Sequence, residues 1–397
     1  MSLTPFTKQQ LLPQEETLEI ARHKSELFIG IPKETSYQER RICLTPDAVN
    51  SLTSHGHRVM IEAGAGLNAS YCDKEYSDAG AEITADTNKV FSCPILLKVE
   101  PLSLQEIKLV SPGAIIISAI QLKTREKSYF EALTKKKVTA LAFEYIKDED
   151  GTYPVVKSLS EIAGTASVLI ASELMSNNQF GKGLLFGNIT GVPPTDVVIL
   201  GAGTVGEFAV RTALGLGANV KVFDNSLTKL RRLQNNVKQC IFTSTVQPKS
   251  LLKALRRCDV VIGAMRGKDR CPVIVTETMV EHMKKGSVIV DVSIDTGGCF
   301  ETSEVTTHER PTFIKHNVIH YCVPNIPSRY CKTSSLSLSN IITPYLLEIA
   351  EDGGLESSIR MNKGLRNGVY MYHGILTNKA IGDWFGLNDS DINLIVF

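Results

Sequence analysis

The chain has 397 residues, more than one hydrophobic core usually organises, so we expect two domains. Its 43 basic and 42 acidic residues leave a formal net charge of +1. This balance argues against nucleic-acid-binding and membrane-surface proteins, which usually carry a basic excess.

Nine cysteines are scattered along the chain without a Cys-x-x-Cys pair. A secreted disulfide framework favours an even, spaced set, and a structural zinc site requires paired ligands. Reduced thiols fit this pattern better, so we expect a cytoplasmic protein without a metal site. No stretch approaches the roughly 20 apolar residues of a membrane-spanning helix. Residues 1–26 have no apolar signal core and are interpreted as an N-terminal arm.

From residue 27 to about residue 144, short apolar runs alternate with segments of helical spacing. Two segments, 46–55 and 127–136, have the spacing of helices. Alternation of strands and helices predicts βαβ units and a mostly parallel sheet. The expected strands are residues 27–31, 58–62, 95–99, 114–120 and 139–143.

A polar turn at residues 148–152 marks a change in the pattern. Ser158-Leu-Ser-Glu161 has the form of a capping box and predicts a helix from Ile162 to about Met175. A glycine-rich loop then leads to a second series of strands, expected at residues 196–200, 220–223, 259–263, 287–292 and 318–323.

After about residue 333 the pattern becomes helical again, over residues 334–350, 361–369 and 381–385. So few elements could hardly form a core alone. We therefore expect this segment to pack back on the first domain and make that domain discontinuous.

A glycine-rich turn, Gly201-Ala-Gly-Thr-Val-Gly206, directly follows an apolar strand and opens a segment with helical apolar spacing. In this arrangement backbone N–H groups and the helix N-terminus receive a pyrophosphate. Gly201 would permit the tight turn, Gly203 the close approach of phosphate, and Gly206 the packing of helix on strand. The expected cofactor contacts in this turn are Gly201, Gly203, Thr204, Val205 and Gly206.

The next strand ends at Asp224. A carboxylate there accepts hydrogen bonds from the adenosine ribose and repels the additional phosphate of NADP, so NAD is the expected cofactor. The nearby Lys229, Arg231 and Arg232 keep NADP open. A chance cluster of loop glycines is the alternative interpretation. The strand before the turn, the helix after it, the second strand and its terminal acid together favour the dinucleotide site.

These patterns predict an α/β fold of two Rossmann-like, doubly wound domains with mostly parallel sheets and a cleft between them. The substrate domain would comprise residues 27–154 and 332–397. The NAD-binding domain would comprise residues 155–331.

Several further segments resemble the alanine dehydrogenase and transhydrogenase α-subunit family. They are Ile29-Gly-Ile-Pro-Lys-Glu34, Arg41-Ile-Cys-Leu-Thr-Pro46, Glu62-Ala-Gly-Ala-Gly66, Leu96-Leu-Lys-Val99, Ser160-Glu-Ile-Ala-Gly164 and Val290-Asp-Val-Ser-Ile-Asp-Thr-Gly-Gly-Cys-Phe-Glu301. The segment Ile294-Asp-Thr-Gly-Gly-Cys-Phe-Glu301 is similar to the alanine dehydrogenase branch in particular. The resemblance implies reversible, NAD-dependent oxidative deamination of L-alanine, or a close small amino acid, to the 2-oxo acid and ammonia. It also implies a homo-hexamer.

The resemblance implies that Arg41 binds the substrate carboxylate, a task that suits the guanidinium fork. Within Glu39-Arg40-Arg41, a solvated surface arginine is the alternative. Lys98 ends an apolar strand, so it either extends to the surface or lines a site at the strand's carboxyl end. The family usually has Lys-x-Lys-Glu-Pro here, whereas this chain has the shorter Lys98-Val-Glu-Pro101. We expect Lys98 to bind substrate.

Gln121 stands where the family's alanine dehydrogenases have a histidine. A glutamine can hydrogen-bond a substrate carbonyl but cannot transfer a proton at neutral pH. Proton transfer would then fall to Asp295, which matches a catalytic position of the family. An aspartate before two glycines also commonly fixes a turn, which is the alternative for Asp295.

Two further residues are expected to contact the cofactor. Ser160 matches a family serine at a helix start, where a hydroxyl can meet phosphate or ribose, or can simply cap the helix. Asn325 matches an asparagine in a family turn that reads Pro324-Asn-Ile-Pro327 here.

Two other functions remain open. Gln121 is compatible with an NAD-linked imino-acid reductase of the saccharopine-dehydrogenase type. The other is a transhydrogenase-like NAD(H)-binding subunit that passes hydride to a partner protein. Arg41, Lys98 and Asp295 favour a pocket for a small amino-acid substrate.

Overall fold

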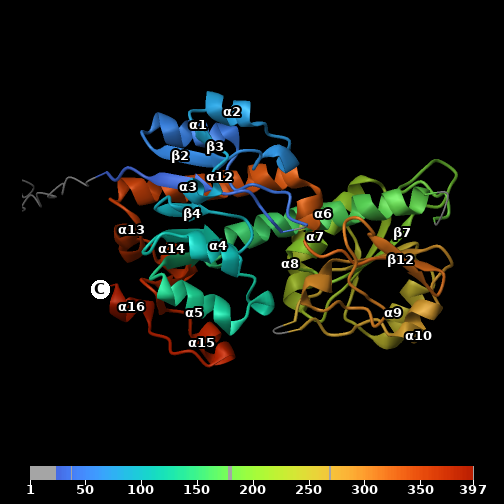
Figure 1. The fold of residues 1–397 in the computed structure, drawn as a ribbon. Coiled ribbons are helices and arrows are strands. Elements are labelled where there is room, and N and C mark those ends of the chain that lie inside the picture. The colour runs from blue at the N-terminus through green and yellow to red at the C-terminus, as the bar shows by residue number, and fades with distance from the viewer. Residues whose placement is uncertain (1–23, 37, 178–180, 268–269, 397) are drawn as a thin grey trace, which may run out of the picture.

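The computed structural model describes residues 24–36, 38–177, 181–267 and 270–396. These residues form two α/β lobes side by side, each built on a mostly parallel sheet (Figure 1). The expected fold class is confirmed. The predicted N-terminal arm lies outside the described residues, except for its last three.

The first sheet has eight strands in the order β15-β14-β6-β5-β4-β1-β2-β3. Strands β1 to β6 are parallel. The central strands β1, β4, β5 and β6 are almost continuously buried, as expected where helices cover both faces, whereas β2 alternates and β3, at the edge, has no buried residue. The strands are β1 (Phe28–Ile31), β2 (Arg58–Glu62), β3 (Glu82–Thr84), β4 (Ile95–Leu97), β5 (Ile115–Ser118), β6 (Thr139–Ala142), β14 (Val369–Tyr372) and β15 (Ile375–Leu376).

Short helices connect these strands. They are α1 (Pro46–Ser54), η2 (Leu67–Ala69), α2 (Asp73–Asp78), α3 (Thr87–Phe91), α4 (Leu104–Leu109), η3 (Leu122–Thr124), α5 (Lys127–Lys135) and η4 (Phe143–Tyr145). The C-terminal part of the lobe adds α13 (Leu355–Met361), α14 (Lys363–Gly368), α15 (Lys379–Phe385) and α16 (Ile392–Ile395).

The C-terminal segment was expected to be helical, but it also supplies two strands. Helix α14 ends at Gly368, and β14 follows directly and pairs antiparallel with β6. All four residues of β14 are buried, so the strand shows no alternation of apolar and polar residues. A short, fully buried strand cannot be told from a buried helix by periodicity, which explains the missed strand.

The second sheet has seven strands in the order β12-β13-β11-β10-β7-β8-β9. Its expected strands are present, and two further strands, β9 and the antiparallel β12, were not predicted. The strands are β7 (Asp196–Leu200), β8 (Asn219–Phe223), β9 (Phe242–Ser244), β10 (Val260–Gly263), β11 (Val288–Asp291), β12 (Thr312–Lys315) and β13 (Val318–Tyr321). The helices are α7 (Thr204–Gly215), α8 (Leu227–Val237), α9 (Pro248–Leu255), α10 (Glu277–Glu281), η5 (Val292–Thr296) and α11 (Ile326–Arg329).

Two long helices connect the lobes: α6 (Pro154–Ser176) leads into the second lobe, and α12 (Cys331–Glu351) leads back (Figure 1). Helix α6 begins at Pro154 rather than near Ile162, so the predicted capping box at 158–161 is wrong. Proline is favoured in the first helical position because the N–H that it lacks has no partner there.

Among the described residues, α6 is long and apolar enough to cross a membrane by length and composition. The expectation that no stretch approaches this limit was therefore wrong. The helix packs against α7, α11, α12 and β11, and 44% of its most apolar window is buried in the protein. Packing against these elements thus accounts for the buried apolar residues of α6, whereas Leu169 is 42% exposed.

Helix α6 approaches the first turn of α7 at Gly164. A Cβ atom on Gly164 would lie 2.3 Å from the Val205 carbonyl oxygen and 2.9 Å from the Phe208 Cβ. Real Cβ atoms do not come this close, so any side chain at this position would push the two helices apart. Gly164 therefore fixes the distance between α6 and the glycine turn before α7.

We expect Gly164→Ala to destabilise the protein by about 1–3 kcal/mol, because the added methyl group overpacks the contact with Val205. The measurement is the melting temperature by circular dichroism. Gly215→Ala is the matched control, since a Cβ atom there would meet nothing within 4 Å at the end of α7. Equal melting temperatures for the two variants would contradict this account of α6 packing.

Candidate active site between the lobes

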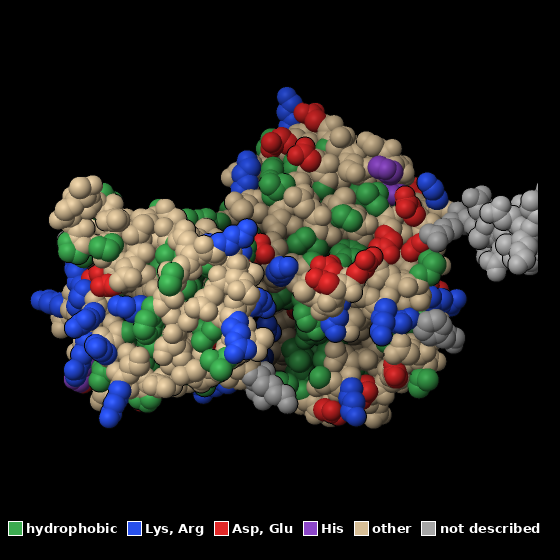
Figure 2. Space-filling view, turned by 180° about the vertical axis from the view of Figure 1, so that it is seen from behind, with side chains coloured by type: hydrophobic (Ala, Val, Ile, Leu, Met, Phe, Trp, Pro, Cys, Tyr) green, Lys and Arg blue, Asp and Glu red, His purple; other side chains and the backbone are tan. Residues whose placement is uncertain are grey.

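The predicted site residues follow the carboxyl ends of parallel strands. In the first lobe, β1 lies between β4 and β2. Strands β2 and β3 are therefore added on one side of β1, and strands β4 to β6 on the other side. In the second lobe, β7 lies between β10 and β8 in the same way. Such reversal points are where open α/β sheets bind ligands. The surface is hollowed between the lobes, and Lys and Arg side chains border the hollow (Figure 2).

Glu39, in the loop after β1, is the centre of a polar network at this place. Its carboxylate accepts hydrogen bonds from Arg41 Nε at 2.7 Å and from Arg41 Nη2 at 2.5 Å. Asn325 of the second lobe donates from Nδ2 to the same carboxylate at 3.0 Å. Arg41 is only 5% exposed, which excludes a solvated surface arginine. Burial by itself would raise the pKa of Glu39, but Arg41 outweighs it and lowers this pKa.

Serine side chains from α11 and α12 hold the loop that carries Arg41. The backbone N–H of Ile42 donates to Ser335 Oγ at 2.9 Å, and that of Thr45 donates to Ser339 Oγ at 3.1 Å. The N–H of Arg40 donates to Ser328 Oγ at 3.1 Å. The helix that returns to the first lobe therefore helps to position the arginine fork.

Lys98 lies in a buried ion cluster beside this network. Its Nζ atom is 3.3 Å from Glu34 Oε2 and 3.1 Å from Glu106 Oε1, and the residue is 2% exposed. Lys98 therefore does not extend to the surface. Burial raises the pKa of Glu34, and the positive charge of Lys98 opposes this shift. Glu34 also accepts the N–H of Val99 at 2.6 Å, which fixes the chain just after β4.

Gln121 follows β5 in a left-handed backbone conformation with φ +47°. Its side-chain Nε2 donates to Glu100 Oε1 at 2.8 Å. The carboxyl groups of Glu100 and Glu39 face one another within hydrogen-bonding range. Burial, with the neighbouring charge of Glu39, raises the pKa of Glu100 to about 7. Next to a glutamine that cannot titrate, the site thus has a carboxyl group that titrates near neutral pH.

Asp295 lies in η5 after β11 and accepts the N–H of Asn325 on Oδ1 at 3.1 Å. Its side chain reaches solvent, yet protein surrounds it closely enough that desolvation raises its pKa. The turn at Gly297 and Gly298 is held instead by Asp291, whose carboxylate accepts the N–H groups of Ser293 and Cys299, both at 3.0 Å. Asp295 therefore does not hold the turn at Gly297 and Gly298, which was the alternative interpretation of this residue.

Three predicted residues thus share one hydrogen-bonded network that joins the lobes through Glu39: Arg41, Asp295 and Asn325. Gln121 is hydrogen-bonded to Glu100 beside this network. Lys98 lies beside this network and is bound to Glu34 and Glu106. Ser160 lies inside α6 and not at its start, so its expected capping position is wrong. Glu39 and Glu100 were not predicted, although the spacing Glu-x-Arg and the acid that follows a buried strand are visible in the sequence.

The glycine turn between β7 and α7 has the geometry of a dinucleotide cradle. Gly201 has φ +111°, and a Cβ atom on Gly206 would lie 1.9 Å from the Gly201 carbonyl oxygen. A Cβ atom on Gly203 would meet nothing within 4 Å, so the turn is open at that point. Gly203 is also the N-cap of α7 and provides no side-chain acceptor, which leaves N–H groups of the first turn for a ligand.

Asp224, which follows β8, contacts this glycine turn. Its Oδ2 accepts the N–H of Ala202 at 2.8 Å, and its Oδ1 accepts the N–H of Ser226 at 2.7 Å. The carboxylate therefore lies against the glycine turn, and each oxygen can accept a further bond from a hydroxyl group. The residues present fit a dinucleotide.

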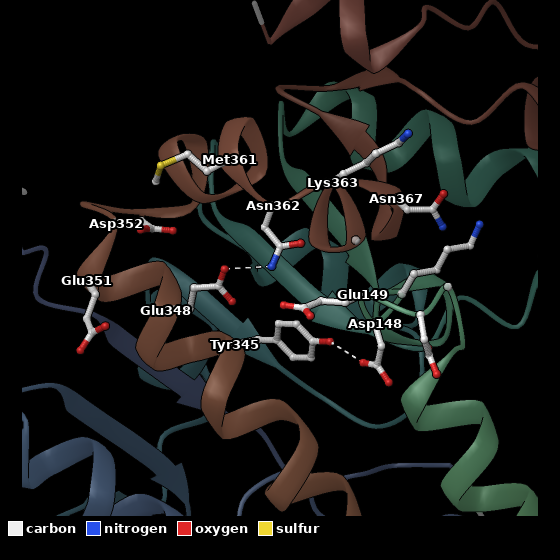
Figure 3. A pocket seen from close by; sticks show the side chains of 14 residues that line it. Asp148, Glu149, Tyr345, Glu348, Glu351, Asp352, Met361, Asn362, Lys363 and Asn367 are labelled. Atoms are coloured by element: carbon white, nitrogen blue, oxygen red, sulfur yellow. Dashed lines mark hydrogen bonds between the residues drawn. The ribbon is translucent and has the colours of Figure 1, made fainter. Parts of the chain in front are cut away.

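A cavity of about 1160 Å³ lies elsewhere in the first lobe, between the turn at residues 147–151 and helices α12 to α14 (Figure 3). Tyr345 donates to Asp148 at 3.2 Å, and Asn362 donates to Glu348 at 2.8 Å. Six carboxylates line the cavity, against two lysines: Asp148, Glu149, Asp150, Glu348, Glu351 and Asp352. This charge would repel a carboxylate substrate, and the cavity contains none of the predicted site residues.

Two family models match the chain. Residues 30–163 match "Alanine dehydrogenase/PNT, N-terminal domain", and residues 167–379 match "Alanine dehydrogenase/PNT, C-terminal domain". Alanine dehydrogenase of Staphylococcus haemolyticus (strain JCSC1435) is 38% identical over 367 residues, which cover 92% of this chain and 98% of that protein. Alanine dehydrogenase 2 of Staphylococcus aureus (strain USA300) is 37% identical over 360 residues, with 90% and 96% covered.

Solved structures give the same result. An L-alanine dehydrogenase aligns with a TM-score of 0.85 and 32% identity, covering 91% of this chain and 99% of that chain. A transhydrogenase from Sinorhizobium meliloti aligns with a TM-score of 0.75 and 24% identity, covering 89% and 99%. The second likeness shows a shared fold.

The two glycines of the turn should respond differently to an added methyl group. We expect Gly206→Ala to lower the melting temperature, because the methyl group would collide with the Gly201 carbonyl oxygen. Gly203→Ala should keep the melting temperature, yet weaken NADH binding at least about tenfold by obstructing the phosphate. Differential scanning fluorimetry and NADH fluorescence titration measure the two effects. Unchanged NADH affinity in Gly203→Ala would rule out phosphate binding at this turn.

Proposed function

The chain belongs to the alanine dehydrogenase/PNT family, and on this basis we propose that it catalyses the reversible, NAD-dependent oxidative deamination of L-alanine or a close small amino acid. The overall reaction converts the amino acid, NAD⁺ and water into the 2-oxo acid, ammonium, NADH and a proton. The observation that carries the proposal is the network in which a buried arginine fork and an accessible aspartate meet between the lobes.

The arginine fork supports binding of a substrate carboxylate. Glu39 engages Arg41 through Nε and Nη2, which leaves the Nη1 side of the guanidinium for a second carboxylate. Bidentate pairing on that side would hold the amino acid in one orientation. The neutral amide of Gln121 would hydrogen-bond the substrate carbonyl without adding charge.

Asp295 is proposed as the group that activates water. Its side chain is accessible, its raised pKa makes it a better proton acceptor than an ordinary aspartate, and the Asn325 N–H fixes its orientation. Lys98 is proposed to position the site: its ion pair with Glu34 fixes the chain that carries Glu100. Direct contact between Lys98 and substrate would require this ion cluster to open.

NAD is the proposed dinucleotide. Gly203, Thr204 and Val205 would receive the pyrophosphate at the start of α7, and Asp224 would accept the ribose hydroxyls and disfavour the additional phosphate of NADP. Ser160 and Asn325 are proposed as further contacts. A dinucleotide held by these residues would supply the nicotinamide ring as acceptor of the hydride from the substrate Cα.

A homo-oligomer, and by family resemblance a hexamer in the cytoplasm, is also proposed. Apolar side chains exposed on the loop between α6 and β7 support a contact between copies: Leu184, Leu185, Ile189 and Val192. Light scattering of the purified protein should give six times the mass of one chain, and Leu185→Ser with Val192→Ser should reduce it. A wild-type monomer would contradict the proposal.

The activity test measures NADH formation by the purified chain with NAD⁺ and L-alanine at alkaline pH, with NADP⁺ and other small amino acids in parallel. We expect turnover with alanine, and much less of it with NADP⁺. Arg41→Lys should lower kcat/KM for alanine roughly 10- to 100-fold, because one charged hydrogen bond of a bidentate pair is lost.

Arg40→Lys is the matched control. Arg40 is exposed, and its hydrogen bonds to Glu39 and Ser328 come from the backbone, so its side chain can change freely. We expect wild-type kcat/KM for this variant. Tight NADH binding without turnover of any amino acid by the wild-type chain would reject the proposed function.

A further inference from the structure

The proposed reaction requires a group that removes a proton from the substrate ammonium, since only the neutral amine can donate its lone pair as the hydride departs. In alanine the ammonium lies one carbon from the carboxylate. The proton acceptor must therefore lie beside the group that anchors the carboxylate. Gln121 cannot take up this proton, and Asp295 lies on the second lobe, where its role is proposed to concern water.

Glu100 is the carboxyl group beside the arginine anchor. It follows β4, next to β1 in the sheet, so it lies at the reversal point of the first lobe. Gln121 Nε2 donates to one of its oxygens at 2.8 Å, and its carboxyl group faces Glu39, which is bonded to Arg41. The residue is partly exposed, so a small ligand can reach it, whereas Glu39 is fully buried and occupied.

We propose that Glu100 is the proton-transfer group for the substrate nitrogen, an inference that rests on the proposed function. As a carboxylate it takes one proton from the ammonium of the amino acid, which frees the nitrogen lone pair. As a carboxylic acid it later returns that proton to the same nitrogen when the C–N bond breaks and ammonia leaves. Over one turnover Glu100 is unchanged, and the electrons of the broken N–H and C–N bonds stay with nitrogen.

The surroundings of Glu100 suit both states. The charged groups that act on Glu100 include Glu39, Arg41 and Glu34, all from the loop after β1. The neutral Gln121 contacts it from the segment after β5. Arg41 keeps Glu39 ionised, and the negative charge of Glu39 raises the pKa of Glu100. Arg41 and the hydrogen bond from Gln121 lower the pKa of Glu100. The resulting pKa of about 7 allows transfer in either direction near neutral pH.

Glu100→Gln tests the proposal because an amide oxygen can still accept the Gln121 hydrogen bond but cannot take up a proton. We expect kcat for alanine deamination to fall about 10²- to 10⁴-fold, with KM for alanine changed less than about threefold. Wild-type kcat/KM should rise with pH through an acid limb near pH 7, and Glu100→Gln should lack this limb. Glu100→Asp retains a titratable carboxyl group and should restore the limb and part of the rate.

A second readout does not depend on turnover. Difference infrared spectroscopy of the cofactor-free protein should detect a carboxyl group that titrates near pH 7 in the wild type and is missing in Glu100→Gln. If the wild type oxidises no amino acid, the proposed function fails. The infrared titration still tests the proposal for Glu100. If the wild type has no carboxyl group that titrates near pH 7, this proposal is overturned as well.

His308→Gln is the control variant. The surroundings of this imidazole include Arg40 and Glu39, so it is a rival proton acceptor near the anchor. We expect the acid limb to persist in His308→Gln. Persistence of the limb and of kcat in Glu100→Gln, or loss of the limb in His308→Gln alone, would overturn the proposal.

Discussion

The burial of the Arg41 guanidinium is the constraint on which the site depends. A buried charge is tolerated only when a partner and further hydrogen bonds compensate for lost hydration, and removing one partner of such a pair typically costs about 3–5 kcal/mol. Glu39 provides the partner, only two positions earlier in the chain. Because the carboxylate of Glu39 also accepts a bond from Asn325, the same pair that prepares the anchor joins one lobe to the other.

From this pair follows the distribution of protons among the neighbouring acids. Arg41 keeps Glu39 ionised, and Glu39 in turn makes ionisation of Glu100 less favourable. Desolvation, with a smaller contribution from the charge of Asp291, also raises the pKa of Asp295. The site thus combines one ionised carboxylate, Glu39, which organises the structure, with neighbouring carboxyl groups whose pKa values are raised. Such a combination is typical of functional sites.

The elements of the fold could be predicted from the sequence where local patterns were strong. Ten strands were predicted to within two residues at each end, because apolar runs bounded by turns identify buried parallel strands. Strands β3 and β9 were missed because each has three residues and little burial. The start of α6 was misplaced because Ser158 and Glu161 imitate a cap, whereas Pro154 begins the helix.

The glycine turn and Asp224 were predictable because every part of that motif is contiguous or nearly so. The roles of Glu39, Ser335 and Glu100 depend on contacts between distant segments, which no local pattern encodes.

The position of β14 has a consequence for how the protein is made. Residues 369–376 complete a sheet whose other strands all precede residue 143, while the strands of the second sheet lie between residues 196 and 321. During synthesis from the N-terminus, the second lobe can therefore close before the first one is complete. Until β14 has been synthesised and has paired with it, β6 is an unpaired edge strand. All four residues of β6 are buried in the folded protein. Such an edge is a template for wrong strand pairing between nascent chains, so we expect the last tenth of the chain to limit aggregation of the newly made protein as well as to complete its core.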